Sequence, residues 1–492
     1  MTASSPSAAV REKLNHPIID ADAHLMEVEP VLLDYLKEVA GPRVSQRYAD
    51  MWKDGRFWGW YQASAEERVR RRIKRAPFWA FPAANTEDRA TAMLPSLLRA
   101  RLEEFGIDFC MVYPTVPILY VGLDDEELRR AVSRAANLMN RDLFADHRDR
   151  LAPAAVIPMH TPAEAIAELD FAVGQLGFKA VMVEGVVRRR IEDDKSSARD
   201  SASPVSSYWI DPLGLDSIHD YDAVWQRCLD LKVAPSMHTS TMGWADRTSI
   251  SNFTYNHIGH FAAGSHAFCK GLVLGGVTRR FPTLKFAFLE CGVGWAASLY
   301  NDLIEHWEKR NVPAMRQTLD PATIDRQALA TLVAKFGHPR IQAHLDRIRA
   351  GTEGYFYGYV DEREDQIDDF THAQITKKRD IYRRFIPNFY FGCEADDRIV
   401  AFAFDKRLHQ FGARFKAMLG SDIGHFDVTD ARTVIAEAHE LVEAEIITPE
   451  DFRDFVFGNV AELHAGMNPD LYKGTVVEDA VAQRLATAQA AE

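Results

Sequence analysis

Eight short runs of β-type residues recur along this 492-residue chain, and most are followed by a segment with helical periodicity. Alternation of this kind is typical of right-handed βαβ units, and eight such units predict a closed (β/α)8 TIM barrel. Helical patterns fill the gaps at 126–146, 162–176 and 222–231. The predicted strands cover residues 17–24, 107–114, 151–160, 178–184, 233–238, 284–290, 388–394 and 415–422.

One barrel domain is expected over residues 17–467, interrupted by three insertions at about 25–100, 186–221 and 305–387. Each insertion follows a strand. Loops after strands surround the active site of such a barrel, so we expect all three to cover its mouth. The second insertion is polar and is interpreted as a flexible lid. Residues 1–16 are interpreted as a disordered lead-in, and residues 468–492 as a peripheral arm that could serve a homodimer.

The balance of charges and cysteines excludes several classes of protein. Asp and Glu outnumber Lys and Arg by 71 to 58, and the formal net charge of −13 argues against general nucleic-acid binding. No apolar run is long enough to predict a membrane span. The N-terminus lacks the apolar centre of a signal peptide, so a cytoplasmic protein is expected. The five cysteines form no Cys-x-x-Cys pair, which excludes a zinc ribbon and argues against a disulfide framework.

The first predicted strand ends in Asp22-Ala23-His24, with Glu27 three residues further on. Side chains two residues apart on a strand share a face, so Asp22 and His24 can point at one divalent metal. The alternative is an aspartate that caps a turn beside a buried histidine. Two interpretations stay open for Glu27: a metal ligand, or an acid in the first turn of a helix that begins near Pro30.

Later strands also end in residues that bind metals. His238 closes the fifth strand, Glu290 the sixth and Asp422 the eighth. We expect His238 to be a ligand rather than a core histidine bonded to a carbonyl group. Asp422 is expected to bind the metal and to accept a proton from bound water. Glu184 and Glu394 end two further strands and are secondary candidates for a ligand or a substrate contact.

The other histidines receive secondary roles. His257, His260 and His266 precede the sixth strand, and helical spacing points them to different faces, so only His266 is favoured as a ligand. His160 ends the third strand just before a helix-start signal, so we interpret it as a cap or as a support for the ligands. His425 is expected to hydrogen bond to a ligand.

Basic and aromatic residues of the insertions predict a substrate-binding surface. Arginines and lysines are dense at residues 68–75 and again at 188–190. Their alternative role is a solvated helix surface or an intersubunit salt bridge. Because both segments lie in loops expected at the mouth, we predict that they bind an anionic group such as phosphate, beside apolar walls. The residues chosen for this role are Arg71, Arg72, Arg75, Arg188 and Trp79.

Five segments carry a family resemblance: Ile19–His24, Met237–His238, Gly275–Pro282, Phe288–Trp295 and Gly420–Asp422. They resemble the amidohydrolase superfamily, in the branch related to metal-dependent decarboxylases. The resemblance implies a metal bound by Asp22, His24, His238 and Asp422. Two features depart from the common pattern: Asp-x-His replaces His-x-His in the first strand, and Glu290 stands where a catalytic histidine is usual.

The resulting ligand set holds about as much carboxylate as imidazole, which suits iron, particularly a dinuclear centre that activates oxygen. The chain is therefore more similar to a smaller group of this superfamily, the nonheme diiron monooxygenases, many of which are thought to act on coenzyme A-linked substrates. This resemblance implies two irons. Asp22, His24, His238 and Asp422 would hold one, and the other would be held by Glu27, Glu290 and either His266 or Glu394.

The expected function is a monooxygenase that hydroxylates a C–H bond of a bulky apolar acid of the diterpenoid type, carried as a coenzyme A thioester. Asp422, Glu290 and His238 are its predicted catalytic residues. Electrons would come from a ferredoxin-type partner, because no flavin- or nicotinamide-binding glycine fingerprint is present. The alternative is a mononuclear zinc or manganese hydrolase or decarboxylase with Asp422 as base. A binding protein without activity is disfavoured, because so many strands end in ligand-type residues.

Overall fold

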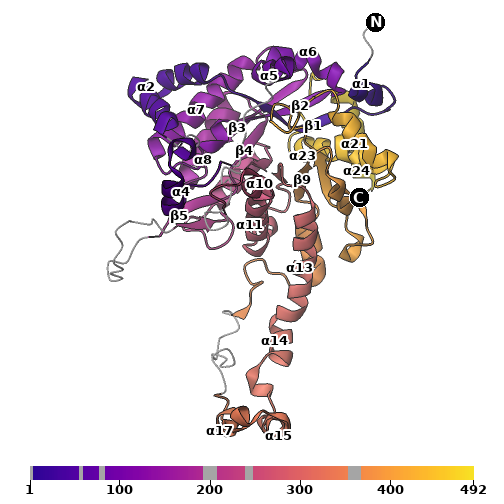
Figure 1. The fold of residues 1–492 in the computed structure, drawn as a ribbon. Helices are drawn as coiled ribbons and strands as arrows, with labels where there is room; N and C mark the ends of the chain where they lie inside the picture. Colours follow the sequence, from indigo (N-terminus) through magenta and orange to yellow (C-terminus); the bar gives the residue numbers. More distant parts are fainter. Residues whose placement is uncertain are drawn as a thin grey trace.

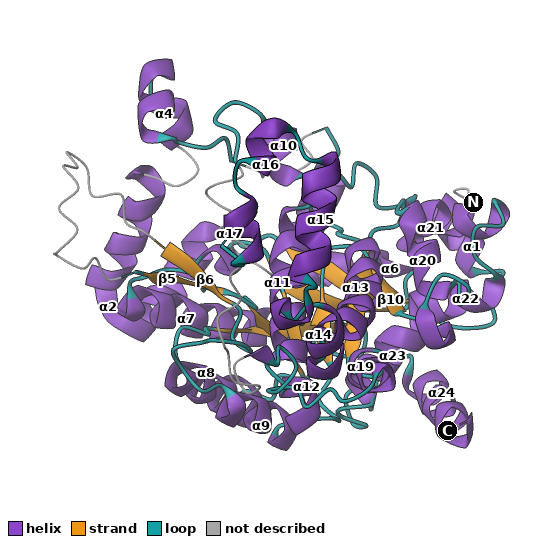
Figure 2. Ribbon diagram, turned by 90° about the horizontal axis from the view of Figure 1, so that it is seen from below, coloured by secondary structure: helices purple, strands orange, loops and turns teal. Residues whose placement is uncertain are grey.

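The structure is a computed structural model that describes residues 4–54, 59–76, 84–191, 208–238, 248–352 and 367–491. Eight parallel strands form one curved sheet, and helices surround it (Figures 1 and 2). The spatial order of the strands follows the chain from β1 to β10. This architecture is a (β/α)8 TIM barrel and confirms the predicted fold.

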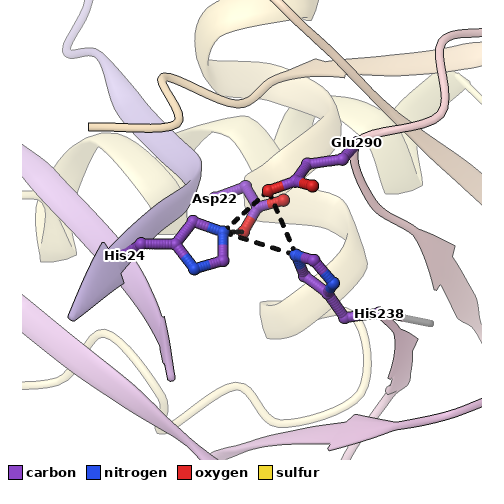
Figure 3. Close-up of side chains that lie close together, drawn as sticks. All are labelled: Asp22, His24, His238 and Glu290. Atoms are coloured by element: carbon purple, nitrogen blue, oxygen red, sulfur yellow. Dashed lines mark hydrogen bonds and ion pairs between the residues drawn. The ribbon is translucent and has the colours of Figure 1, made fainter. Parts of the chain in front are cut away.

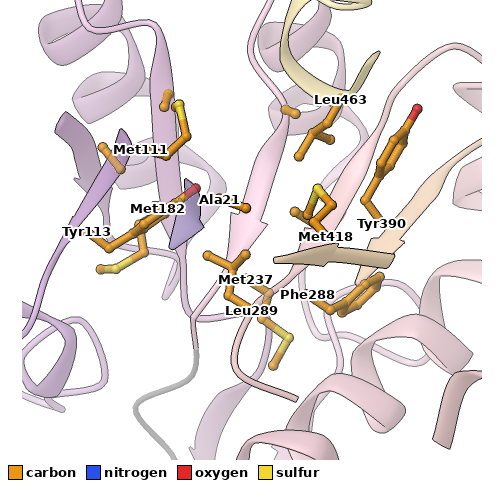
Figure 4. Close-up of a cluster of buried hydrophobic side chains, with 14 of the residues drawn as sticks. Ala21, Met111, Tyr113, Met182, Met237, Phe288, Leu289, Tyr390, Met418 and Leu463 are labelled. Carbon is orange, nitrogen blue, oxygen red and sulfur yellow. The ribbon is translucent and has the colours of Figure 1, made fainter. Parts of the chain in front are cut away.

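All eight predicted strands are present, within a few residues of their expected bounds. They are apolar and almost entirely buried, because helices cover the outside of the barrel and packed side chains fill its inside. Figure 4 shows part of the hydrophobic core that the strands share with the helices. The strands are β1 Ile19–Leu25, β2 Phe109–Pro114, β3 Leu151–Ile157, β4 Ala180–Val183, β7 Pro235–Met237, β8 Phe286–Phe288, β9 Phe389–Cys393 and β10 Lys416–Leu419.

The barrel closes beyond the end of β10, where the chain runs alongside β1. The backbone N–H of Asp422 donates to the carbonyl oxygen of Asp22 at 3.0 Å, and the N–H of His24 donates to Ile423 at 3.1 Å. The pairing of β1 with β2 shifts register in the same part of β1, as at a β-bulge. Closure therefore places the residues after β10 directly beside Asp22 and His24.

Helices between the strands form the outer layer of the barrel. The three predicted helical segments are confirmed as α7 Glu126–Leu143, α8 Pro162–Leu169 with the π-helical turn Asp170–Gln175, and α9 Asp222–Asp230. The other helices of this layer are α6 Pro95–Phe105, α11 His260–Leu274, α12 Val277–Arg280, α13 Gly294–Arg310, α19 Lys378–Phe385, α20 Ala401–Phe404, α21 Val434–Glu443, α22 Pro449–Arg453 and α23 Asn459–Ala465.

The first insertion is helical and contacts the loop after β7. It contains α2 Glu29–Asp54, α3 Gly59–Gln62, α4 Ala65–Arg71 and α5 Thr86–Met93. The indole N–H of Trp60 donates to the carbonyl of Ile250 at 2.6 Å, and the amide of Asn256 donates to the carbonyl of Arg75 at 2.7 Å. Asn256 belongs to α10 Phe253–His257, whose rings Phe253 and His257 pack on Phe426 after β10. The first insertion and α10 thus form a joint cover at the mouth.

The other two insertions differ from their expected form. The second contains an antiparallel hairpin of β5 Val187–Arg190 and β6 Tyr208–Asp211, and the rest of the predicted flexible lid between them, residues 192–207, lies outside the described residues. The third continues from α13 into α14 Val312–Thr318, α15 Arg326–Phe336, α16 Pro339–Gln342 and α17 Leu345–Arg349. These helices extend away from the barrel instead of covering its mouth (Figure 1).

Both termini pack on the barrel body. Residues 1–16, expected to be a disordered lead-in, contain helix α1 Pro6–Arg11, and its Ser7 side chain is fully buried. The C-terminal segment buries Leu471 and Tyr472 before α24 Glu478–Ala491, and Arg484 of this helix pairs with Glu462 of α23 at 2.8 Å. Among the described residues, no helix is both long and apolar enough to cross a bilayer.

Candidate metal centre

The centre begins with β1, whose carboxyl end carries Asp22 and His24. Both side chains are buried, and they point toward His238 after β7 and Glu290 after β8 (Figure 3). Nε2 of His24 lies 2.9 Å from Oε1 of Glu290, 3.3 Å from Nε2 of His238 and 3.4 Å from Oδ1 of Asp22. Nε2 of His238 is 3.2 Å from Oε1 of Glu290. Four predicted site residues from three strands are therefore brought together.

Asp422 and His425 extend this cluster on the side where the barrel closes. Oδ1 of Asp422 is 3.5 Å from Nε2 of His24, and Nδ1 of His425 contacts Asp422 and lies 3.4 Å from Oε1 of Glu290. The six residues form two overlapping sets of possible ligands that share His24 and Glu290, with the ligand atoms of each set within 4.8 Å of one another. The first set adds Asp22 and His238, and the second adds Asp422 and His425.

The donor set fits a divalent cation. A ring nitrogen can donate one proton to one acceptor, yet three carboxylate oxygens crowd around Nε2 of His24. Both oxygens of Asp22 are buried without a hydrogen-bond donor among the described residues, and histidine ring nitrogens crowd Oε1 of Glu290 and Oδ1 of Asp422. Buried carboxylate oxygens in this state are costly unless a cation lies between them. Mixed nitrogen and oxygen ligands of this kind suit zinc, manganese or iron.

The pKa values of the carboxyl and imidazole groups are shifted because these groups are buried close together. Burial raises the pKa of Asp22 and of Asp422 well above the ordinary value, and the negative charge of Glu290 adds to both shifts. Burial also opposes the ionisation of Glu290, but the charge of His238 and hydrogen bonds from His238, His24 and His425 together hold the pKa of Glu290 well below its usual range. Burial and the charge of His24 lower the pKa of His425. A bound cation would favour the ionised form of every carboxylate here.

Two of the carboxylates stand on strained backbone. Glu290 has φ 48° and Asp422 has φ 53°, in the left-handed region that residues other than glycine seldom adopt. Such strain concentrates at functional sites. Gly420 makes the arrangement possible, because a Cβ added there would lie 2.9 Å from Cβ of Asp22. Nearby, buried Asp20 accepts a hydrogen bond from Ser421 N at 2.9 Å and fixes the turn that presents Asp422.

Thr115, which follows β2, and Glu27, which follows β1, support the centre. The hydroxyl of Thr115 lies 3.2 Å from Nδ1 of His24 and 3.2 Å from Nε2 of His425. The carboxylate of Glu27 accepts hydrogen bonds from the backbone N–H groups of Thr115 at 3.2 Å and Val116 at 2.8 Å. Glu27 therefore holds the segment that carries Thr115, and it belongs to neither ligand set. Burial raises the pKa of Glu27 to about 8.

Three other predicted ligands lie outside both sets. His266 on α11 is half-buried and faces Trp295, with ring centroids 6.1 Å apart. Glu394 is exposed after β9, where packing around its carboxyl group and the negative charge of Asp427 raise its pKa to about 8. Glu184 is buried at the end of β4. Among the four acids that follow later strands, only Glu290 and Asp422 belong to the two sets.

The predicted substrate-binding arginines do not converge on the centre. Arg71 is exposed and pairs with Glu67 one helical turn away at 2.6 Å, and Arg72 is exposed at the end of α4. Arg75 stacks on the ring of Trp60 at 4.0 Å, and exposed Arg188 stacks on Tyr208 at 4.2 Å. Trp79 lies outside the described residues. The surface interpretation of these basic segments therefore describes their positions better.

Sequence reasoning missed a buried arginine beside the end of β3. Arg189 pairs with Asp211 at 3.0 Å and donates to the backbone carbonyl of His160 at 2.6 Å and to the hydroxyl of Tyr221 at 2.9 Å. The alternation of exposed and buried residues in β5 separates it from Arg188 and Arg190. That alternation was the signal available, because the middle arginine on a strand faces the side opposite to the other two. Arg189 therefore fixes the hairpin to the barrel.

Comparison with known proteins identifies the family. The sequence profile described as Amidohydrolase matches residues 19–342, about two thirds of the chain. The chain belongs to the amidohydrolase family. The match contains Asp22, His24, His238 and Glu290, and it ends before Asp422.

Three solved structures of low sequence identity are similar to this chain over most of its length. An amidohydrolase from Mycobacterium avium subsp. paratuberculosis K-10 is 16% identical, with 92% of this chain and 99% of that chain covered and a TM-score of 0.51. A dihydroxybenzoic acid decarboxylase from Polaromonas sp. JS666, solved with bound manganese, is 16% identical over 91% of this chain and 97% of that chain, with a TM-score of 0.44. A 4-oxalomesaconate hydratase from Rhodopseudomonas palustris is 14% identical over 96% and 99%, with a TM-score of 0.44.

Proposed function

We propose that this protein is a metal-dependent hydrolase or decarboxylase with one divalent ion, zinc or manganese, in the candidate centre. The observation that carries the proposal is the convergence of buried carboxylate and imidazole groups around Nε2 of His24, including Asp22, whose oxygens have no hydrogen-bond donor among the described residues. Membership of the amidohydrolase family supports it. This function is the alternative that was predicted from the sequence beside the monooxygenase.

Asp22, His24, His238 and Glu290 would hold the ion, and Asp422 lies beside them. When bound, a zinc or manganese ion supplies Lewis acidity that polarises a carbonyl or carboxylate oxygen. The protein must keep these side chains in place before the ion arrives. Thr115 does so by bridging His24 and His425 with its hydroxyl group.

Asp422 is the residue best placed to carry a proton. Its carboxyl group is buried, and burial together with the charge of Glu290 raises its pKa well above the ordinary value. A carboxyl group in such a site can take up a proton from water during hydrolysis, or deliver one to carbon after loss of carbon dioxide. His425 contacts Oδ1 of Asp422 and orients it. The left-handed backbone of Asp422 aims the group at His24 rather than along the strand.

A second candidate is the diiron monooxygenase predicted from the sequence. The observation that favours it is the size of the cluster, because six residues in two overlapping sets offer enough ligand groups for two ions, with His24 serving only one of them. In this alternative the second ion would be held by Asp422 and His425, in place of the predicted Glu27, His266 or Glu394. The coenzyme A thioester substrate and the ferredoxin-type electron donor belong to this candidate alone.

Dependence on dioxygen separates the two candidates. Protein loaded with zinc or manganese is assayed without oxygen or reductant against amides, esters and carboxylic acids, with release of protons and carbon dioxide as readouts. Our proposal predicts anaerobic turnover that the Glu290→Ala variant abolishes. Turnover that appears only with iron, dioxygen and an electron donor would contradict it and establish the second candidate.

A further inference from the structure

A cavity of about 160 Å³ lies at the end of the barrel opposite the metal centre. The beginnings of β2 and β3 line it through Phe109 and Leu151, whereas the metal centre lies at the ends of the strands. Phe178 before β4 and Leu471 from the C-terminal segment complete an apolar wall. The cavity is therefore built from four separate parts of the chain and is independent of the centre.

The charged part of this cavity is entirely cationic. Its lining includes Arg141, Arg148, Lys179 and Lys473 but no aspartate or glutamate among the described residues, although acids outnumber bases in the whole chain. Arg141 pairs with the adjacent Asp142 at 2.6 Å, and Nζ of Lys179 donates to the carbonyl of Leu471 at 3.1 Å. In the described part of the chain, neither Arg148 nor Lys473 forms an ion pair. Two cations are therefore left to face the cavity without a counterion from the described protein.

Three of these cations, Lys179, Arg148 and Lys473, repel one another. Burial lowers the pKa of Lys179, the charge of Asp470 opposes that shift, and the charges of Arg148 and Lys473 add to it. Arg148 and Lys473 are exposed side chains at the edge of this apolar wall, where their positive charges attract an anion. Guanidinium and ammonium groups bind carboxylate and sulfonate-type oxygens through charge-assisted hydrogen bonds.

We propose that this cavity binds a small amphipathic anion, with an acidic group at the cations and a flat apolar ring against Phe109, Phe178 and Leu471. The volume is below the roughly 300–1,000 Å³ of pockets for drug-sized ligands, so the ligand has a single ring. The amino-terminal face of such a barrel contributes to stability rather than catalysis. The bound anion therefore stabilises the fold by joining the C-terminal segment to the bases of β2 and β3.

Benzenesulfonate is the probe, because it combines one aromatic ring with one ionised sulfonate group. It is titrated into the full-length protein while heat of binding and melting temperature are measured. The test variant is Arg148→Gln with Lys473→Gln, and the matched control is Lys335→Gln with Arg340→Gln, which removes two exposed cations of α15 and α16. The same titration is repeated on protein freed of metal with a chelator, and with inorganic sulfate in place of the probe.

The proposal predicts that benzenesulfonate raises the melting temperature of the wild-type and control proteins, and that the test variant binds it at least about tenfold more weakly. Binding is unchanged in the metal-free protein, and sulfate binds more weakly than the probe. Absence of binding, equal binding by the test variant, or dependence on the metal would each overturn the proposal. Equal binding of sulfate would overturn the apolar part of the site.

Discussion

At the metal centre, the hydroxyl group of Thr115 lies between the rings of His24 and His425. We predict that Thr115→Val keeps the fold but weakens metal binding by about 10- to 100-fold, because groups that orient metal-binding imidazoles carry that much affinity. Competition with a chelator of known affinity measures the change. Thr331→Val, at an exposed position of α15, is the control. Unchanged affinity in the Thr115 variant would show that the bridge has no role.

Glu27 and Glu290 were both predicted as ligands, and the structure gives them different surroundings. Glu27 accepts two backbone N–H groups, whereas Glu290 faces His24 and His238. We expect Glu290→Ala to lose its metal and Glu27→Gln to retain it. The side-chain amide in Glu27→Gln can accept only one of the two N–H groups, so this variant loses about 1–2 kcal/mol of stability. Elemental analysis and thermal unfolding of both variants distinguish these roles, and loss of metal from Glu27→Gln would make Glu27 a ligand.

Only some residues of the centre could be predicted from their positions at the ends of strands. Asp22 and His24 could be placed from their spacing on one strand, and His238 from its position at the end of another. Glu394 and Glu184 also end strands, yet only Glu290 and Asp422 enter the centre among the four acids that follow later strands. The difference lies in left-handed backbone at those two positions, which no side-chain pattern indicates. His425 joins them because the closing turn folds back after Asp422.

At the scale of elements, helix α1 supplies the N-terminal cap of α21, a helix in a distant part of the chain. Oγ of the buried Ser7 accepts the backbone N–H groups of Ile435 at 3.0 Å and Ala436 at 3.3 Å. These groups are among the unpaired N–H groups of the first turn of α21, where the side chain of Thr433 makes no capping bond. Ser7 therefore acts as the N-terminal cap of α21 although 428 positions separate it from Ile435.

We predict that Ser7→Ala lowers stability by about 1–2 kcal/mol, the usual value of a lost cap with buried N–H groups. Thermal unfolding measures it as a decrease of about 1–3 °C in melting temperature. Ser298→Ala, at an exposed position of α13, is the control and should be neutral. A neutral Ser7→Ala variant would show that α1 is attached by its other contacts.

The elements were predictable where the pattern is local. Eight strands and three helices could be predicted, because each strand and helix of a barrel has its own periodic pattern of apolar residues. Helix α1 was missed because its apolar residues are few and its stability comes from α21 and α6. The form of the second insertion was not predictable, since the hairpin of β5 and β6 depends on contacts of Arg189 with Asp211 and Tyr221.

For the whole molecule, buried histidines predict sensitivity to acid. Burial lowers the pKa of His464 to about 3, of His160 to about 3 and of His260 to about 4, from an ordinary 6.5. The unfolded chain therefore binds more protons than the folded chain below about pH 6.5, so stability falls as the pH falls from there toward the folded pKa values. Stability above pH 6.5 does not depend on the titration of these groups.

The His464→Gln variant tests this dependence at a site remote from the metal centre. We expect it to flatten the loss of stability between about pH 6.5 and 4, because one depressed group no longer titrates. Urea unfolding of metal-free protein across this range measures the slope without the effect of metal release. His372→Gln, at an exposed position, should leave the slope unchanged. An equal slope in wild type and His464→Gln would contradict the assignment.

The architecture as a whole was accessible from sequence, but the reaction was not. The strand ends of a barrel converge whatever reaction the protein catalyses. Asp22, His24, His238 and Asp422 at such ends therefore predict a metal site but not the reaction. The number of metal ions that the centre can bind depends on the distances between the side chains of Glu290, Asp422 and His425. Those distances come from the closing turn and not from residue type.

Metal content of the purified protein tests the central claim most directly. The protein is expressed with zinc, manganese and iron all supplied, and metals are counted by elemental analysis for wild type, Asp22→Ala and Glu290→Ala. Our account predicts about one zinc or manganese ion per wild-type chain and almost none in either variant. Two irons per chain, or a single ion that both variants retain, would contradict it.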